Sequence, residues 1–120
     1  MDNLSDLTAL RVFDGVVARV VHGDQASLAI VELAPGAEVP EHRHPHDQLG
    51  VLLRGSVTFQ IGTDRRALRP GAVWRILGGI PHHAVAGPDG AVVVEAFAPR
   101  RADWDALPAV STTPPLTWPP

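Results

Sequence analysis

Histidine is concentrated in two short segments of this chain. The first segment, 41–48, places His42 and His44 two residues apart. Side chains two residues apart in an extended strand point to the same face, so these two imidazoles should lie together. A third imidazole must come from elsewhere, and the other histidine cluster is His82 with His83. Three convergent histidines are a ligand set for a divalent transition metal, although a His-x-His pair alone also fits a solvated turn.

The residue inventory narrows the chemistry further. The chain has no cysteine, lysine or tyrosine. Thiolate metal sites, disulfides, Schiff-base chemistry and phenolic acids are therefore excluded, and any metal must be held by nitrogen and oxygen. Histidine, aspartate, glutamate and arginine remain as the groups that could move protons or stabilise charge.

The two histidine clusters are separated by several expected strands, so only a closed barrel or a sandwich would bring them together. Apolar residues alternate with polar or small ones, as in Val57, Phe59 and Ile61, and turn residues interrupt the short runs. This rhythm predicts an all-β fold. Strands are expected near 11–14, 16–22, 27–33, 38–44, 48–54, 56–61, 65–69, 73–76, 82–86 and 91–97.

A chain of 120 residues is the size of one domain. We expect the barrel to occupy 1–100 and a C-terminal extension to occupy 101–120. Residues 101–107 can form a short helical turn. The proline-rich stretch 111–120 cannot lie inside a sheet, so it is either a disordered tail or an arm on a partner subunit.

The spacing around the first histidine cluster resembles the first sequence motif of the cupins. Gly36 is followed after five residues by His42 and His44, after three more by Gln48, and after six more by Gly55. The family usually has glutamate where this chain has Gln48. This departure bears directly on the chemistry of the site.

The second histidine cluster resembles the second cupin motif. Gly71 is followed after five residues by 77–79 and after two more by His82, and fifteen residues separate Gly55 from Gly71, as in compact bacterial members. Leu77 stands where the family often has proline, and Ala86 where it often has asparagine. These two departures concern turn geometry.

The resemblance implies a cupin fold, which is a single-domain jelly-roll barrel or double-stranded β-helix. It also implies one divalent transition metal (Zn, Ni, Fe or Mn) on His42, His44, His82 and Gln48. Gln48 would either ligate the metal directly or hydrogen-bond a water on it. A neutral amide leaves the full charge of the ion in place, which favours Lewis-acid chemistry on a substrate oxygen over activation of dioxygen.

The sequence offers three further candidates, Glu95, Arg101 and His46. Glu95 is a carboxylate in an apolar strand, where an unpaired charge is costly. With Phe97 and Arg101 it is similar to the Asp-x-Phe…Arg ending of small cupins that convert unsaturated uronate sugars to open keto forms, whose acid and arginine lie in the substrate cavity. The alternative is a structural Glu95–Arg101 pair. His46 follows a strand-bending proline and is expected at the rim of the site as a proton carrier, or as a further ligand.

The leading functional hypothesis is a non-redox, metal-assisted enzyme. It would catalyse tautomerisation, cyclisation or dehydration of a small carbonyl or enol substrate, with Glu95 or His46 moving a proton. The resemblances to uronate-converting cupins and to cupin-type polyketide cyclases both support this class. The alternatives are an iron dioxygenase with a three-histidine site and a binding module without turnover. His22 and His83 are expected at the surface, outside the site.

Charge and hydropathy restrict the partners. The net charge of −3 and the pI near 6.0 provide no basic field for nucleic acid. The acidic N-terminus lacks a signal sequence, and no apolar run approaches the ~20 residues of a membrane span. We therefore expect a cytoplasmic protein that binds a small molecule, and a homodimer that covers the exposed sheet edges.

Overall fold

Two long antiparallel strands, β5 (Asp47–Ile61) and β8 (His82–Ala98), pair along most of their length and form the centre of the fold. The computed structural model describes residues 1–112 and 115–120. The remaining elements, with η marking a 3-10 helix, are η1 (Leu4–Asp6), β1 (Leu10–Phe13), β2 (Val16–His22), β3 (Ser27–Leu33), β4 (Glu38–His42), β6 (Asp64–Leu68), β7 (Val73–Ile76) and η2 (Ala102–Ala106).

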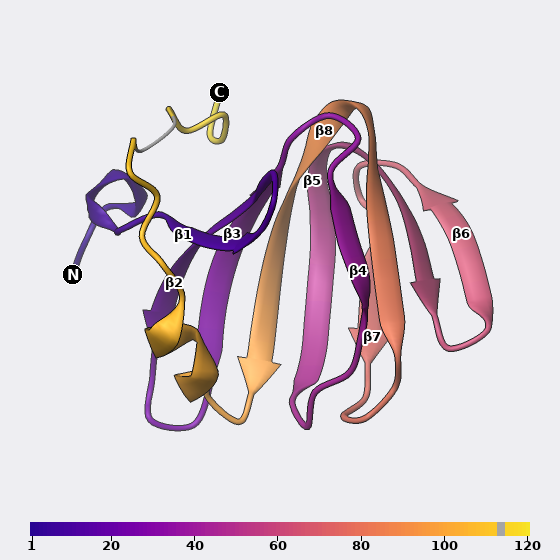
Figure 1. The fold of residues 1–120 in the computed structure, drawn as a ribbon, viewed down its shortest axis with the longest axis horizontal. Coiled ribbons are helices and arrows are strands. Elements are labelled where there is room, and N and C mark those ends of the chain that lie inside the picture. Colours follow the sequence, from indigo (N-terminus) through magenta and orange to yellow (C-terminus); the bar gives the residue numbers. More distant parts are fainter. Residues whose placement is uncertain (113–114) are drawn as a thin grey trace.

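Each long strand belongs to two sheets. The first half of β8 pairs with β4 and its second half with β3, while the first half of β5 pairs with β7 and its second half with β6. One sheet therefore runs through β1, β2, β3, β8, β5 and β7, and the other through β4, β8, β5 and β6 (Figure 1). Their inner faces enclose the core, as in a jelly roll.

Glycine permits the close approach of β5 and β8 where the chain passes from one sheet to the other. Gly55 has φ +79°, and a Cβ there would lie 2.0 Å from the carbonyl oxygen of Gly90. Gly90 has φ +73°, and its Cβ would lie 2.5 Å from the carbonyl oxygen of Leu33. No other residue type fits either position without moving the backbone. The register of β5 against β8 also shifts around Gly55, so the strand bends there without ending.

The alternation of side chains sets the core. In β3 every second residue, from Ser27 to Leu33, is buried. Leu52, Ile76 and Val16 are the largest side chains that are fully buried. The inward faces also carry polar groups at one end of the barrel, namely Gln48, His82 and Glu95, which are each no more than 9% exposed. Buried polar groups of this kind need partners or a function.

The structure agrees with most of the predicted strands and corrects two features. Strands 16–22, 27–33 and 73–76 are as predicted. The four segments predicted as separate strands near 48–54, 56–61, 82–86 and 91–97 form only two strands, because bulges and positive-φ glycines bend the chain without breaking the pairing. The strand predicted over 38–44 ends at His42.

The C-terminal extension packs on its own barrel where the structure describes it. The helical turn expected in 101–107 is η2. Within the proline-rich stretch, residues 113–114 lie outside the described residues. Beyond them, the Thr117 backbone and hydroxyl donate to Glu32 at 3.2 and 2.7 Å, and Arg54 donates to the Thr117 carbonyl. Among the described residues, no helix has the length and apolar character to cross a membrane.

Candidate functional site

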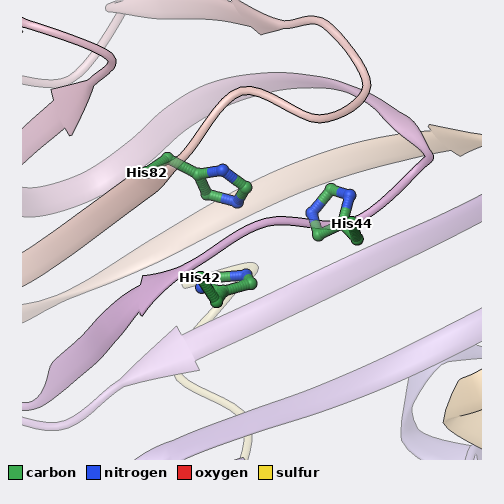
Figure 2. Close-up of side chains that lie close together, drawn as sticks. All are labelled: His42, His44 and His82. Carbon is green, nitrogen blue, oxygen red and sulfur yellow. The ribbon is translucent and has the colours of Figure 1, made fainter.

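Three histidines from two segments meet at one end of the barrel. His42 ends β4, His82 begins β8, and the two are register partners across the sheet. His44 lies in the turn after β4. One ring nitrogen from each histidine lies within 4.8 Å of the others. Figure 2 shows the three imidazoles turned toward a common space.

Backbone hydrogen bonds fix which nitrogen of each ring faces that space. His42 Nδ1 lies 2.8 Å from the Pro40 carbonyl oxygen, His44 Nδ1 lies 3.1 Å from that of His46, and His82 Nδ1 lies 2.9 Å from that of Ile80. A carbonyl oxygen only accepts, so each Nδ1 carries the proton and donates. Each neutral ring therefore keeps its lone pair on Nε2, which is the arrangement seen in metal-ligating histidines.

The buried end of this cluster fits a cation. His82 is 3% exposed, and its Nε2 atom is buried without a hydrogen-bond partner in the described part of the chain. Burial lowers the pKa of His82 to about 4, with smaller contributions from the charges of the other two histidines, and the pKa of His44 is lowered by burial and by the charge of Arg101. Both rings are therefore neutral near pH 7 and can offer lone pairs.

Gln48 adds an oxygen to this set. Its Nε2 donates to Glu95 Oε2, which turns its Oε1 toward His44 Nε2 at 3.1 Å. Both atoms of that second contact carry lone pairs, so the contact is unfavourable unless a cation lies between them. An imidazole nitrogen and an amide oxygen at this separation could both offer a lone pair to one cation. The observed separation therefore suits direct ligation by Gln48.

Glu95 lies behind Gln48, in the buried interior. Its Oε2 accepts from Gln48 Nε2 and from Trp74 Nε1, the latter at 3.3 Å. Burial raises the pKa of Glu95 to about 6, while the two hydrogen bonds and the charge of Arg101 oppose that rise. A carboxyl group with this pKa can accept and release protons near neutral pH.

Arg101 pairs with a different acid from the one considered in the sequence. Its Nε and Nη2 donate to Asp103 at 3.1 and 3.0 Å, and its guanidinium carbon lies 4.8 and 4.7 Å from the ring centroids of Phe97 and Trp104. Arg101 and Glu95 form no ion pair in the described structure. The guanidinium acts on Glu95 and the histidines through its charge.

The remaining histidines lie outside the three-histidine cluster. His46 is 8% exposed, its Nδ1 has no hydrogen-bond partner among the described residues, and its Nε2 lies 3.8 Å from Asp103. Burial and the charge of Arg101 lower the pKa of His46. His22 contacts Ser27 and Asp105, and His83 lies 3.6 Å from Glu38.

Two residues at the site were not found from the sequence. Trp74 donates to Glu95, and Asp103 holds Arg101. The signal for Trp74 was available, because it shares a strand face with the buried Ile76. Asp103 lies two residues from Arg101 in η2, but a local pair of charges on a short helical turn does not by itself point to a site.

Comparison with protein-family models decides the family. A model described as a cupin domain matches residues 29–97, which span both histidine segments and Glu95. The chain belongs to the cupin family. The jelly-roll topology of this cupin, with its metal-ligand candidates at one end of the barrel, agrees with that membership.

Similar proteins share most of the length of this cupin. Over 93 residues it is 29% identical to the pectin degradation protein KdgF of Dickeya dadantii. The aligned region covers 76% of this chain and 84% of KdgF. The solved structure of KdgF from Halomonas sp. superimposes with a TM-score of 0.76 at 27% identity, covering 82% of this chain and 92% of that one. An RmlC-like cupin from Shewanella frigidimarina has a TM-score of 0.80 at 19% identity, covering 86% and 93% of the two chains, and so shares the fold.

Proposed function

We propose that this cupin is a metal-dependent isomerase that converts an unsaturated uronate sugar to its open-chain keto form. The observation that carries the proposal is the link between Gln48 and Glu95. This hydrogen bond places a buried carboxyl group, with a pKa near neutrality, next to a set of converging lone pairs. A proton-transfer group and a cation site within one barrel end suit carbonyl–enol chemistry.

The ligands we propose for the metal are His42, His44, His82 and Gln48. The orphaned Nε2 of His82 and the facing lone pairs of His44 and Gln48 both support a cation there. Nitrogen and amide oxygen suit Zn, Ni, Fe or Mn and do not choose among them. When bound, such a metal supplies a Lewis acid that polarises a substrate oxygen and keeps its full charge, because no carboxylate is among the ligands.

The proposed reaction needs no redox partner. In an unsaturated uronate the hemiacetal carbon–oxygen bond of the ring breaks, giving an aldehyde and an enol. The enol then loses its hydroxyl proton while the neighbouring carbon gains one, which forms the ketone, so the conversion is an isomerisation. Glu95 would carry this proton through Oε1, because its Oε2 already accepts from Gln48 and Trp74.

The substrate class is supported by the relatives. Two of them are KdgF proteins, one of which is named for pectin degradation, and pectin is a polymer of uronate sugars. The buried arginine Arg101 also gives the barrel end a positive charge, which suits an anionic substrate. The buried carboxyl group of Glu95, with its raised pKa, favours enzymatic turnover over a pure binding module.

The test is turnover of an unsaturated uronate by protein of known metal content. Elemental analysis of the purified protein would identify the ion. The double bond of the substrate is conjugated to its carboxylate, so ketonisation should abolish the ultraviolet absorbance of that group. Metal-replete protein that leaves this absorbance unchanged would overturn the proposed reaction. Oxygen uptake by iron-loaded protein would instead indicate a dioxygenase.

A further inference from the structure

A cleft of about 320 Å³ lies between β6 and β7, which pair with opposite halves of β5. Its apolar wall is formed by Phe59 and Trp74, which are both 8% exposed, with ring centroids 5.1 Å apart. Arg66 of β6 is the register partner of Phe59 and so presents its side chain on the same face of the sheet. Aromatic faces beside a guanidinium suit a sugar ring that carries a carboxylate.

One residue of the cleft, Trp74, contacts the candidate site, and a second, Ile61, is a strand neighbour of it. Trp74 lines the cleft and also donates to Glu95 at 3.3 Å. Ile61 lines the cleft and is the register partner of His82. Trp74 therefore connects the cleft to the carboxyl group proposed to move the proton, while the ligands proposed for the metal lie outside the lining of the cleft.

The charges of the cleft favour an anion. Arg66 and Arg75 line it together with one acid, Asp64. Arg66 Nε contacts Asp64 at 3.0 Å, but the side chains of both residues are more than 60% exposed. An exposed pair of this kind contributes little free energy, so an incoming carboxylate can displace Asp64.

Arg101, the arginine that the sequence favoured for substrate binding, is already occupied. Its guanidinium contacts the rings of Phe97 and Trp104, and Asp103 accepts from its Nε and Nη2. Arg101 is also only 7% exposed. A substrate carboxylate would have to break an ion pair to bind it bidentately, whereas Arg66 is accessible.

We propose that the cleft between β6 and β7 is the subsite that captures the uronate, with Arg66 binding its carboxylate and the ring lying against Phe59 and Trp74. The choice of a uronate rests on the proposed function. Arg66 is therefore a specificity residue of the site. Because it would bind substrate and transition state alike, its loss should raise KM and leave kcat nearly unchanged.

Binding can be tested without turnover by titrating the metal-replete protein with glucuronate and, as a neutral match, glucose. Nuclear magnetic resonance should show the indole N–H of Trp74 shifting with glucuronate and not with glucose. Arg66→Ala should weaken glucuronate binding about tenfold, in line with the loss of one charge-assisted contact. The control is Arg65→Ala, because Arg65 is equally charged, is exposed and pairs with Gln60 on the opposite face of the same strands.

Three outcomes would overturn the capture subsite. The first is equal weakening of glucuronate binding in Arg66→Ala and Arg65→Ala, and the second is no glucuronate binding by the wild type. The third is a shift of the Trp104 indole N–H without one at Trp74, which would place the carboxylate at Arg101. Failure of the proposed reaction would appear separately, as a lack of ketonisation by protein that still binds glucuronate through Arg66.

Discussion

Gln48 and Glu95 lie 47 positions apart in the chain and are joined by a buried hydrogen bond from Gln48 Nε2 to Glu95 Oε2. The other end of the same amide, Oε1, lies 3.1 Å from His44 Nε2. One neutral side chain thus links the histidine cluster to the carboxyl group proposed to move a proton. A change at position 48 should therefore affect both the metal and the acid.

Removal of any one of the three clustered histidines should empty the metal site. We expect His42→Ala, His44→Ala and His82→Ala each to lower the bound metal well below one per chain, because each loses one convergent Nε2. His83→Ala is the matched control, since His83 follows His82 directly but contacts Glu38. Elemental analysis decides the matter, and equal metal in all four variants would refute the assignment.

Gln48→Glu should keep the metal and slow the reaction. The added carboxylate donates negative charge to the ion, which then polarises a substrate oxygen less strongly. It also replaces a hydrogen-bond donor to Glu95 with a like charge, which should raise the pKa of Glu95 further. The measurements are metal content and the pH dependence of kcat/KM. Wild-type turnover with an unchanged pH profile would contradict this electrostatic role.

Glu95→Gln should preserve the fold and the metal but lower kcat by about 10²–10⁴, the usual range for a positioned acid or base. The amide keeps the shape of the side chain and loses only the titratable proton. Glu41→Gln, at an exposed carboxylate next to His42, is the control and should leave the rate unchanged. A Glu95→Gln variant that melts early yet turns over normally would show a structural role instead.

Metal-free protein should lose stability in acid. Burial lowers the pKa of His82 from 6.5 to about 4, so the folded state resists protonation of a ring that the unfolded state protonates readily. This contribution is present above pH 6.5 and is lost as the pH falls toward 4. The raised pKa of Glu95 acts in the opposite direction.

The contribution of His82 can be isolated by comparing chelator-treated wild type with chelator-treated His82→Gln, because Glu95 is common to both. The difference between their melting temperatures should shrink as the pH is lowered from 6.5 toward 4. A difference that is independent of pH would show that His82 does not titrate as its burial implies.

The outer face of the first sheet supports the expectation of a homodimer. Val21, Leu28 and Leu49 are each more than 50% exposed. They lie in one row across the sheet, because Val21 pairs with Leu28, Leu28 with Ala96, and Ala96 with Leu49 on neighbouring strands. A row of exposed aliphatic side chains on the outer face of a sheet suits packing against a second sheet. We expect a dimeric mass at micromolar concentration, and Leu28→Glu should shift it toward monomer. A monomeric wild type would refute the prediction.

The sequence by itself determined the fold class and most of the strands. Period-two burial, as in 27–33, and glycines at the turns are local properties, which is why β2, β3 and β7 could be predicted with their bounds. The spacing of His42, His44, Gln48 and His82 likewise indicated the family and the residues that meet at the barrel end. These features depend on neighbours in the chain or on motif spacing, and the sequence contains both.

Only the tertiary structure decided how the side chains are paired. Arg101 binds Asp103 and not Glu95, while Glu95 accepts from Gln48 and Trp74. The Nε2 atoms converge because backbone carbonyls bind each Nδ1. Strand period tells which face a residue occupies, but the partner on that face depends on the register between strands far apart in sequence. Arg66 shows the same limit, because only its pairing with Phe59 places an ordinary charged residue at the cleft between β6 and β7.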